Sequence, residues 1–470
     1  MKLLDDRPDL IAQSGRGTIE AMISFRSWQP NRLLVFALVA PLAALVLLAG
    51  CSGEPEDDSP PDDNAGAVDI PDEPTYHEHI APLVHDHCTG CHTEDAIAPF
   101  ALESFEEVQQ HASLSHATMQ AGTMPPWPPA EDCGDFRGER RMHPTEIELF
   151  GRWLDQGAVA GEQSDEQLPD HSEDIDDAQP DLTVDTGVDY TPEPPEGFDD
   201  DYRCFVVDPD LDGDRFVNSV DTRPGNPQLV HHMIAYTAPP EADDEIAELK
   251  AEDDRPGYEC FGSPRYSGSR MIGGWVPGAQ RPLLEEGHGL RVPEDSRIVV
   301  QMHYTTHHNG EGSDRTEVDF FFVDEQQHPD PTELIIMRLA EMDMLIDAGD
   351  PDATVTAETP LIPQSVTVHG IAPHMHLLGT NVRVDATTGD GDVCLIDIPD
   401  WDFHWQGLYL YEEPMQLARP FRIELTCEYD NSEHNQPDGQ PPRDVTWGDE
   451  STDEMCVALI VAEVPDDLEL

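Results

Sequence analysis

Basic side chains are scarce in this chain of 470 residues, which has 25 lysines and arginines against 97 aspartates and glutamates. The only lysines are Lys2 and Lys250, and the formal net charge is -72 at pH 7. So negative a surface repels phosphate backbones, which excludes a nucleic-acid partner. We expect a solvated, salt-adapted surface outside the cytoplasm, with an acidic docking face as the alternative.

An apolar run from Leu33 to Leu48 follows two arginines and ends in Leu-Ala-Gly-Cys51, which resembles a bacterial lipobox. The alternative is a transmembrane anchor, but the run is short for a span. We therefore predict that residues 1–50 are a signal peptide, with Met22 as the alternative start, and that Cys51 is lipidated. The predicted product is an exported lipoprotein on a membrane facing the periplasm or cell surface, most simply the outer membrane. Disulfides persist in such a compartment.

Acidic, proline-bearing stretches without hydrophobic periodicity divide the mature chain. Residues 51–74 are predicted to be a flexible tether, and residues 162–189 an acidic linker. These stretches leave a small domain at 75–161 and a long region from 190 onward. A boundary near residue 330 divides that region into domains at 190–330 and 331–470.

The small domain contains Cys88, Cys91 and His92 in the pattern C-x-x-C-H, directly after a run with helical spacing. In this pattern both thiols bond to haem vinyl groups and the histidine ligates the iron. A zinc half-site and a thioredoxin-like dithiol are the competing interpretations. Neither has support, because no second C-x-x-C follows and no βαβ pattern surrounds the motif.

Met124, in a proline-stiffened loop, is the predicted sixth ligand of the haem iron, and the rival ligands are His111, His116 and His143. A capping box beginning at Thr145 and closed by Glu148 predicts the final helix of this domain. Residues 75–161 resemble a class I type cytochrome c domain, which implies a small all-α fold with covalent haem c.

From Asp181 onward, short strand-like runs are divided by Pro, Gly and Asp clusters, and helical periodicity is nearly absent apart from Glu241 to Lys250. This pattern predicts two antiparallel β-sandwich, jelly-roll-like domains in series. The clearest runs are Phe216–Val220, Arg297–Tyr304, Val318–Val323 and Arg422–Tyr429.

The first β-domain contains a set of metal-type residues: His231, His232 and His303. Adjacent residues on a strand point to opposite faces, so His231 and His232 can bind one ion only if the backbone bends there. Three imidazoles suit copper, zinc, iron or nickel.

The second β-domain contains His374, His376 and Met455. Histidines two residues apart on a strand point the same way, and a methionine sulfur favours Cu(I) over hard cations. The alternatives are ordinary polar surface for the histidines and core packing for Met455. A copper ion that cycles between two oxidation states implies electron transfer or dioxygen chemistry.

Six motifs occur in the order found in copper type II, ascorbate-dependent monooxygenases, which include the peptidylglycine α-hydroxylating and dopamine β-monooxygenases. The similarity covers about 190–466. The motifs are Val230-His231-His232-Met233, Gly274-Trp275 to Gly278, Glu286-Gly287-His288-Gly289-Leu290-Arg291-Val292, Gln301-Met302-His303-Tyr304, His374-Met375-His376-Leu377-Leu378-Gly379 and Ser451-Thr452-Asp453-Glu454-Met455-Cys456.

This resemblance implies two copper ions with different tasks. The first histidine set would hold the copper that stores an electron, and the set with Met455 would hold the copper where dioxygen binds. The substrate C–H would lie beside the second copper, in a solvent-filled cleft between the domains. The resemblance also implies disulfides between Cys427 and Cys456 and between Cys204 and Cys260, and leaves Cys133 and Cys394 unassigned.

Two departures concern the substrate. In the peptide-hydroxylating relatives an arginine and a tyrosine hold the peptide carboxylate, and the matching positions here are Ala372 and Leu459. Peptide amidation is therefore not expected. We expect a small, less polar substrate instead. An aromatic stretch without a charge anchor agrees with this, although core packing is the simpler interpretation for most of its members: Trp401, Phe403, Trp405, Tyr409 and Tyr411.

The leading hypothesis is a copper-dependent monooxygenase that receives electrons through the fused haem, tethered at high effective concentration by the acidic linker. Ascorbate or a periplasmic or surface electron donor would be the external reductant. One alternative is a non-catalytic copper and haem electron-transfer or copper-binding lipoprotein. Another is an adhesion or assembly protein with decayed metal sites, which predicts missing ligands.

Overall fold

A computed structural model describes residues 67–93, 98–163, 179–195, 200–252, 254–276, 281, 283–306, 312–436, 439–448 and 450–464. The predicted signal peptide, Cys51, Gly278 and much of the acidic linker lie outside the described residues. Within the described ranges, no helix is both long and apolar enough to span a membrane.

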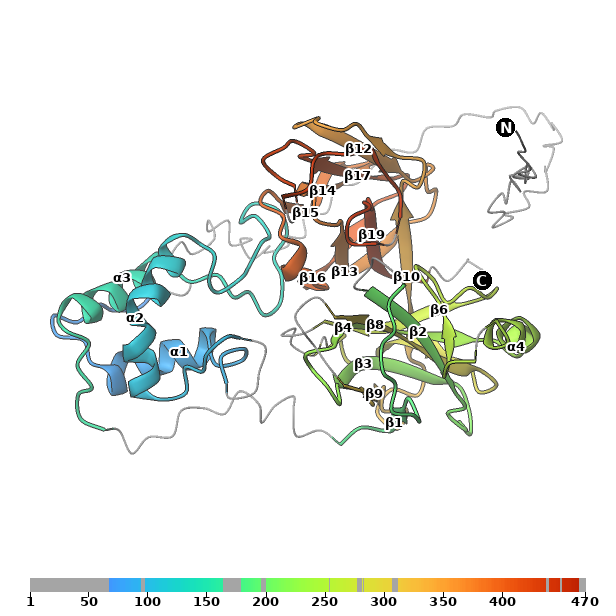
Figure 1. The fold of residues 1–470 in the computed structure, drawn as a ribbon, viewed down its shortest axis with the longest axis horizontal. Helices are drawn as coiled ribbons and strands as arrows, with labels where there is room; N and C mark the ends of the chain where they lie inside the picture. Colours follow the sequence, from blue (N-terminus) through green and yellow to red (C-terminus); the bar gives the residue numbers. More distant parts are fainter. Residues whose placement is uncertain are drawn as a thin grey trace, which may run out of the picture. The chain divides into compact units, whose positions relative to one another are not determined.

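The helices of the segment 67–163, of which 94–97 are not described, pack around one apolar core. Buried side chains from every helical element contribute to it, among them Ile80, Val108 and Trp153. Figure 1 shows these helices in blue and teal. They are η1 Tyr76–Ile80, α1 Ala81–His87, α2 Phe105–Gln120 and α3 Pro144–Asp155.

The start of α3 differs from the prediction, which placed the N-cap at Thr145. In the structure His143 is the N-cap, and the side chain of Glu146 closes the capping box. The helix begins two residues early because Pro144 suits the first helical position, where no backbone N–H is needed.

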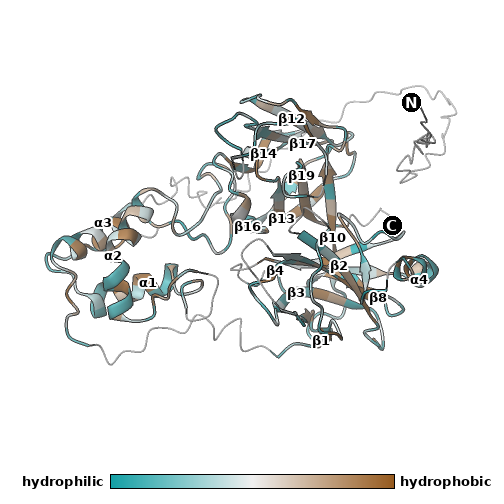
Figure 2. Ribbon diagram, viewed as in Figure 1, coloured by the Kyte–Doolittle hydropathy of each residue, from teal (hydrophilic) through white to brown (hydrophobic). Residues whose placement is uncertain are grey.

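From residue 179 onward the described chain is mostly β-sheet with few helices, which agrees with the predicted β-sandwich domains. The helix α4 (Asp243–Lys250) lies in the predicted helical run, after the short η2 (Pro240–Ala242). Strand β17 alternates between exposed or partly exposed and buried residues, as a strand with one face on the core does. Apolar residues lie along strands such as β8, and many connecting loops are hydrophilic (Figure 2).

The strands of the first β-domain are β1 Leu182–Asp185, β2 Asp200–Val207, β3 Arg215–Arg223, β4 Val230–Ala238, β5 Tyr258–Glu259, β6 Arg270–Trp275, β7 His288–Val292, β8 Arg297–Thr305 and β9 Glu317–Phe322. Those that follow are β10 Thr332–Ala340, β11 Leu345–Ile346, β12 Ala353–Glu358, β13 Val366–His374, β14 Gly379–Thr388, β15 Gly391–Ile398, β16 Tyr409–Leu417, β17 Arg422–Tyr429, β18 Val445–Thr446 and β19 Val457–Glu463. The short η3 (Phe403–Trp405) lies between β15 and β16.

Both sandwiches contribute strands to one eight-stranded sheet, ordered β1-β9-β3-β7-β10-β19-β13-β16. One apolar cluster joins its first half to the sheet β5-β2-β8-β4-β6, and another joins its second half to the sheet β12-β17-β14-β15. Strands β7 and β10 pair in parallel, whereas the sequence predicted antiparallel sandwiches. A parallel pair needs a long connection, and here β8 and β9 lie between the two strands in the chain.

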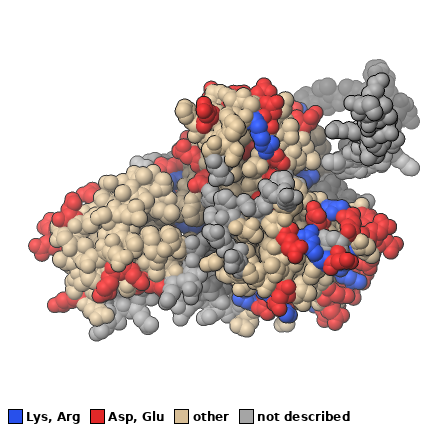
Figure 3. All heavy atoms as spheres, in the orientation of Figure 1, with Lys and Arg blue, Asp and Glu red and all other residues tan. Residues whose placement is uncertain are grey.

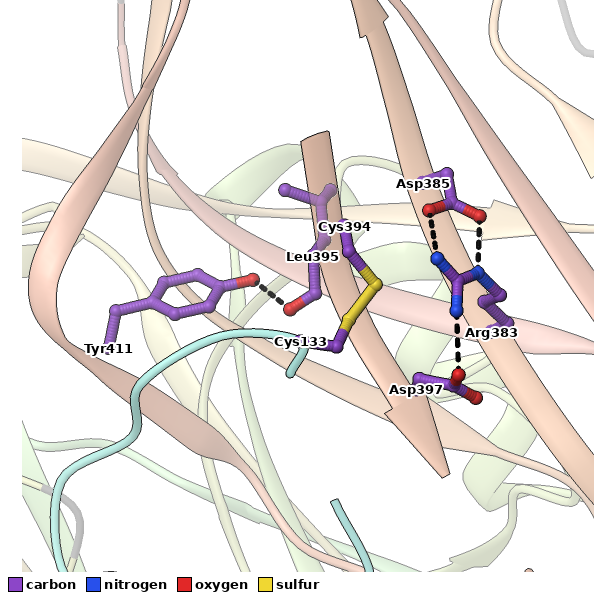
Figure 4. Close-up of a disulfide and its surroundings, with 7 residues drawn as sticks. All are labelled: Cys133, Arg383, Asp385, Cys394, Leu395, Asp397 and Tyr411. Atoms are coloured by element: carbon purple, nitrogen blue, oxygen red, sulfur yellow. Dashed lines mark hydrogen bonds and ion pairs between the residues drawn. A yellow bond between two sulfur atoms is a disulfide. The ribbon is translucent and has the colours of Figure 1, made fainter. Parts of the chain in front are cut away.

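The loop between α2 and α3, residues 121–143, is bonded to the second sandwich. Cys133 forms a disulfide with Cys394 of β15, which assigns the two cysteines left over by the sequence. Figure 4 shows this disulfide beside the hydrogen bond from the Tyr411 hydroxyl to the Leu395 carbonyl, 2.8 Å long. The helical segment is therefore attached to the β-region by a covalent bond as well as by the linker.

Aromatic rings extend the contact around this disulfide. Phe136 forms an isolated β-bridge with Tyr411, and their rings stack with centroids 5.1 Å apart. The ring of Tyr409 lies 5.6 Å from that of Trp127. Tyr409 and Tyr411 are both buried, so core packing and loop docking account for these two members of the aromatic stretch.

Acidic side chains are spread over the face of the molecule shown in Figure 3, and basic side chains occupy a few places among them. Several arginines pair with carboxylates, as Arg383 does with Asp385 and Asp397 (Figure 4). The scarce cations are thus used partly to neutralise neighbouring acids.

Candidate metal centre

The first histidine set converges because strand β4 is irregular. His232 lies opposite His303 of β8, and the register of this pair shifts between Val230 and His232. Such a shift accommodates one extra residue, here His231, and turns its side chain. This is the backbone bend that adjacent histidines need in order to reach one ion.

The Nδ1 atoms of the three imidazoles lie close together. The Nδ1 atom of His232 lies 3.2 Å from that of His231 and 3.3 Å from that of His303. Nitrogen ligands about 2.0 Å from a tetrahedral ion are separated by roughly 3.3 Å. Both distances therefore fit ligands of a single ion, and one ligand atom from each of the three histidines lies within 4.8 Å of the others.

Asp200, the first residue of β2, fixes the tautomer of His303. Its carboxylate accepts a hydrogen bond from the Nε2–H of His303 at 3.0 Å, which leaves the Nδ1 lone pair for a metal. The ring of Tyr202 stacks on the same imidazole at a centroid distance of 4.1 Å. Sequence reasoning missed Asp200, because one acid among 97 carries no local signal.

The second histidine set lies at the end of β13 and in the turn that follows. The Nδ1–H of His374 donates to the side-chain oxygen of Gln406, and the Nδ1–H of His376 donates to the carbonyl of Asp453 at 3.2 Å. Both bonds use Nδ1, so Nε2 is the nitrogen that each ring can offer to an ion. The two ring centroids are 5.0 Å apart.

The buried carboxylate of Glu454 joins the two loops that carry the second set. Its Oε2 accepts from the backbone N–H groups of His376 at 2.9 Å and Met455 at 3.3 Å, and its Oε1 accepts from that of Leu378 at 2.7 Å. Burial acts to raise the pKa of Glu454, whereas these three hydrogen bonds favour the ionised carboxylate and act in the opposite direction. Glu454 is a second functional residue that sequence reasoning missed, although it lies within a quoted motif.

Met455 is buried next to this carboxylate. Its backbone carbonyl accepts a hydrogen bond from the Tyr429 hydroxyl at 2.8 Å, and the next residue, Cys456, is bonded to Cys427 of β17. Together these contacts hold the backbone of Met455 beside that of His376.

The disulfides Cys427–Cys456 and Cys204–Cys260 join the pairs that the family resemblance implies. The Cys204–Cys260 disulfide is connected to the first histidine set, because Cys204 lies in β2, the strand that begins with Asp200. The side-chain amide of Gln301, two residues before His303, donates to the Cys260 carbonyl at 2.6 Å. Each disulfide therefore braces a strand or loop that carries a metal-type residue.

Phe403 lies between the two histidine sets. Its ring stacks on His231 at a centroid distance of 5.7 Å and meets His376 edge-on at 5.8 Å. The loops also touch, since the Ser451 hydroxyl donates to the Asp200 carboxylate at 3.2 Å. The two sets thus face one another across an aromatic ring.

Four of the imidazoles, those of His232, His303, His374 and His376, are held neutral. Burial, reinforced by neighbouring imidazoles, lowers the pKa of His232 and His303 well below the usual histidine value. Burial also lowers the pKa of His374, and it lowers that of His376 to about 3. Their lone pairs are available at neutral pH without displacement of a proton, as a metal ligand requires.

The C-x-x-C-H motif follows α1. Cys88 and Cys91 belong to none of the three disulfides. Burial raises the pKa of Cys91 and raises that of Cys88 to about 12, whereas a thioredoxin-like dithiol needs a lowered thiol pKa. The Nδ1–H of His92 donates to the Phe100 carbonyl at 2.9 Å, so Nε2 is the nitrogen that can face an iron.

The four candidate sixth ligands have different surroundings. Met124 is half-buried in the loop between α2 and α3. His111 stacks on Phe100 at 3.9 Å, His116 lies against Phe150 at 6.2 Å, and His143 caps α3. The structure thus gives His143 a different task.

Residues 352–462 match the family model described as copper type II ascorbate-dependent monooxygenase, C-terminal domain. This segment contains His374, His376 and Met455. The match supports the copper type II ascorbate-dependent monooxygenase family and a copper-dependent oxidoreductase function of this kind.

A comparison with curated protein sequences finds no match. Among solved structures, the VP2 subviral particle of infectious bursal disease virus has 10% identity and a TM-score of 0.18, over 60% of this chain and 71% of that one. The STIV MCP has 9% identity and a TM-score of 0.19, over 55% of this chain and 99% of that one. Similarities this weak carry no argument about fold or function.

Replacing Glu454 with glutamine leaves one acceptor oxygen where three backbone N–H groups now share two. We expect the affinity of the second set for Cu(I) to fall about 10- to 100-fold, because its loops lose their common partner. Competition with a Cu(I) chelator measures this. The matched control is Asp453→Asn, whose side chain pairs with Arg443 at 3.1 Å instead. Equal affinities in the two variants would show that Glu454 does not position the site.

Proposed function

We propose that this protein is a copper-dependent monooxygenase that inserts one atom of dioxygen into a C–H bond of a small substrate. The observation that carries the proposal is the pair of histidine sets on either side of Phe403, whose ring contacts His231 of one set and His376 of the other. Imidazole and thioether ligands suit copper, which when bound supplies one-electron redox chemistry and dioxygen activation.

The residues would divide their work between the two sets. The first would hold the electron-storing copper through Nδ1 atoms, and the second would hold the oxygen-activating copper through Nε2 atoms and the Met455 sulfur. Asp200, Gln406 and the Asp453 carbonyl would keep His303, His374 and His376, respectively, in the required tautomer. Overall, substrate C–H, dioxygen, two electrons and two protons give the alcohol and water.

The substrate proposal concerns the face of the sheet that carries His374. Ala372 lies two residues before it on β13 and directly opposite Leu459 of β19. Residues two apart on a strand share a face, so these two apolar side chains lie beside the oxygen-activating set. A small substrate of low polarity fits this pair better than a carboxylate-terminated peptide, which would lack a counter-charge there.

The proposed electron source is a covalent haem in the helical segment. The two protonated, half-buried thiols and the oriented His92 support haem attachment at Cys88, Cys91 and His92, with Met124 as the sixth ligand. Strand β16, which docks the loop of Met124, pairs with β13, and β13 ends at His374. The haem segment would thus be docked on the second sandwich and would pass electrons to the electron-storing copper of the first set, and an external donor or ascorbate would reduce the haem.

We further propose that the protein is exported and anchored in the outer membrane through a lipid on Cys51. Three disulfides support an oxidising compartment. Palmitate labelling of the expressed full chain, compared with Cys51→Ser, tests the anchor.

Single turnover with labelled dioxygen tests the proposed reaction. The copper-loaded, reduced protein is mixed with ¹⁸O₂ and a panel of small apolar compounds, and the products are analysed by mass spectrometry. We expect label in an alcohol for the native chain and none for His376→Gln, which loses a predicted ligand of the oxygen-activating copper. Label in no product from any compound would favour the alternative, a copper and haem electron carrier.

Stopped-flow spectroscopy of the haem tests the electron source. In the native protein, mixing with dioxygen and a substrate should reoxidise the haem faster with copper than without. Replacing both Cys133 and Cys394 with serine removes the covalent bond of the docked loop and loosens it, so reoxidation should slow, while direct copper reduction by ascorbate is unchanged. If copper does not accelerate haem reoxidation in the native protein, the haem is not the electron donor. An unchanged reoxidation rate in the double variant would mean that the acidic linker alone holds the haem close enough for electron transfer.

A further inference from the structure

A second cluster of metal-type side chains lies away from both histidine sets. His288 begins β7, His369 lies in the irregular part of β13, and Glu463 ends β19. One ligand atom from each lies within 4.8 Å of the others. His369 precedes His374 by five residues on the same strand, which corresponds to roughly 16 Å. The cluster is therefore separate from the copper sets.

The hydrogen bonds of His288 leave its Nε2 without a suitable protein partner. Its Nδ1–H donates to the Glu286 carbonyl at 3.1 Å, and a carbonyl can only accept. In the neutral ring Nε2 is then a bare lone pair, and it faces the Glu463 carboxylate at 3.9 Å. Two acceptors face each other, which is unfavourable unless the ring is protonated or a cation lies between them.

His369 also turns its Nε2 toward Glu463. Its Nε2 lies 3.1 Å from the Glu463 carboxylate, a hydrogen-bond distance at which an ion would take the place of the ring proton. The Glu285 carboxylate lies on the other side of the ring, 3.8 Å from Nδ1, which is too long for a direct hydrogen bond. The side chain of His369 is 3% exposed and that of Glu463 32%, so the cluster is a crevice open on one side.

The loop before β7 is held rigidly, which is what a preformed site requires. The side-chain amide of Asn218 on β3 donates to the carbonyls of Leu284, Glu285 and His288 at 3.0 to 3.2 Å. The backbone N–H of Thr332 on β10 donates to the Gly287 carbonyl at 2.8 Å. The position of His288 is thus fixed by two neighbouring strands.

We propose that His288, His369 and Glu463 bind a third metal ion, a divalent first-row ion of the zinc type. Two imidazoles and one carboxylate form a common zinc donor set, and they lack the sulfur that favours Cu(I). The ion lies between both Nε2 atoms and the Glu463 oxygen, and its remaining position faces solvent. It ties β7 of the first sandwich to β13 and β19 of the second.

Zinc binding by the full-length, copper-loaded protein tests this site. After exposure to Zn²⁺ and desalting, elemental analysis should find one further equivalent of zinc in the native chain. Glu463→Gln and His288→Gln should each weaken zinc binding by at least about tenfold. The matched control is His328→Gln, whose side chain lies 3.9 Å from the exposed Glu286 carboxylate in the same region.

Zinc should also raise the thermal unfolding temperature of the native chain and of His328→Gln, but not that of Glu463→Gln. If the native chain retains no additional zinc, the cluster is an ordinary histidine–glutamate ion pair and the proposal is wrong. If the native chain and the Glu463→Gln and His288→Gln variants retain equal amounts of zinc, the zinc is bound elsewhere and the proposal is also wrong. Neither outcome depends on oxygen insertion.

Discussion

The second histidine set depends on one buried carboxylate, that of Glu454. A carboxylate without water costs several kcal/mol unless hydrogen bonds replace its hydration, and here three backbone N–H groups do so. Because these groups belong to two loops far apart in the sequence, the carboxylate can be satisfied only when the loops are together. The distance between His376 and Met455 is thereby fixed by an interaction that involves neither side chain.

The first set is fixed differently, by an irregularity in β4 and by Asp200. This aspartate holds the tautomer of His303 and also accepts a hydrogen bond from Ser451, in the loop that leads to Glu454 and Met455. The orientation of His303 in the first set is thus coupled to the loop that carries Met455 of the second set. Continuous pairing of β10 with both β7 and β19 adds backbone hydrogen bonds between the two sandwiches.

The two sets of candidate ligands could be named from the sequence because histidine spacing on strands and ordered motifs are visible there. The mostly-β fold and the helices α1, α3 and α4 were predictable from periodicity and capping signals, whereas α2 (Phe105–Gln120) was not predicted. Asp200, Gln406 and Glu454 were not, since their importance arises only when distant segments meet. The disulfide of Cys133 with Cys394, 261 residues apart, is likewise a tertiary contact without a local signal.

The shared eight-stranded sheet also depends on tertiary contacts that the sequence does not reveal. The sequence predicted strand-like runs at β3, β8, β9 and β17, but the parallel pairing of β7 with β10 depends on how the two sandwiches meet. Phe403 belonged to an aromatic stretch in which core packing was the simplest interpretation for most members. Tyr409 and Tyr411 follow that interpretation, whereas Phe403 contacts both histidine sets.

The central claim is that each histidine set binds its own copper ion. Anomalous diffraction at the copper edge from crystals of the copper-loaded full-length protein tests it most directly. Two copper peaks are predicted, one bound by the Nδ1 atoms of His231, His232 and His303, and one by the Nε2 atoms of His374 and His376 with the Met455 sulfur. A single copper shared between the sets, or copper bound through the opposite ring nitrogens, would contradict the account.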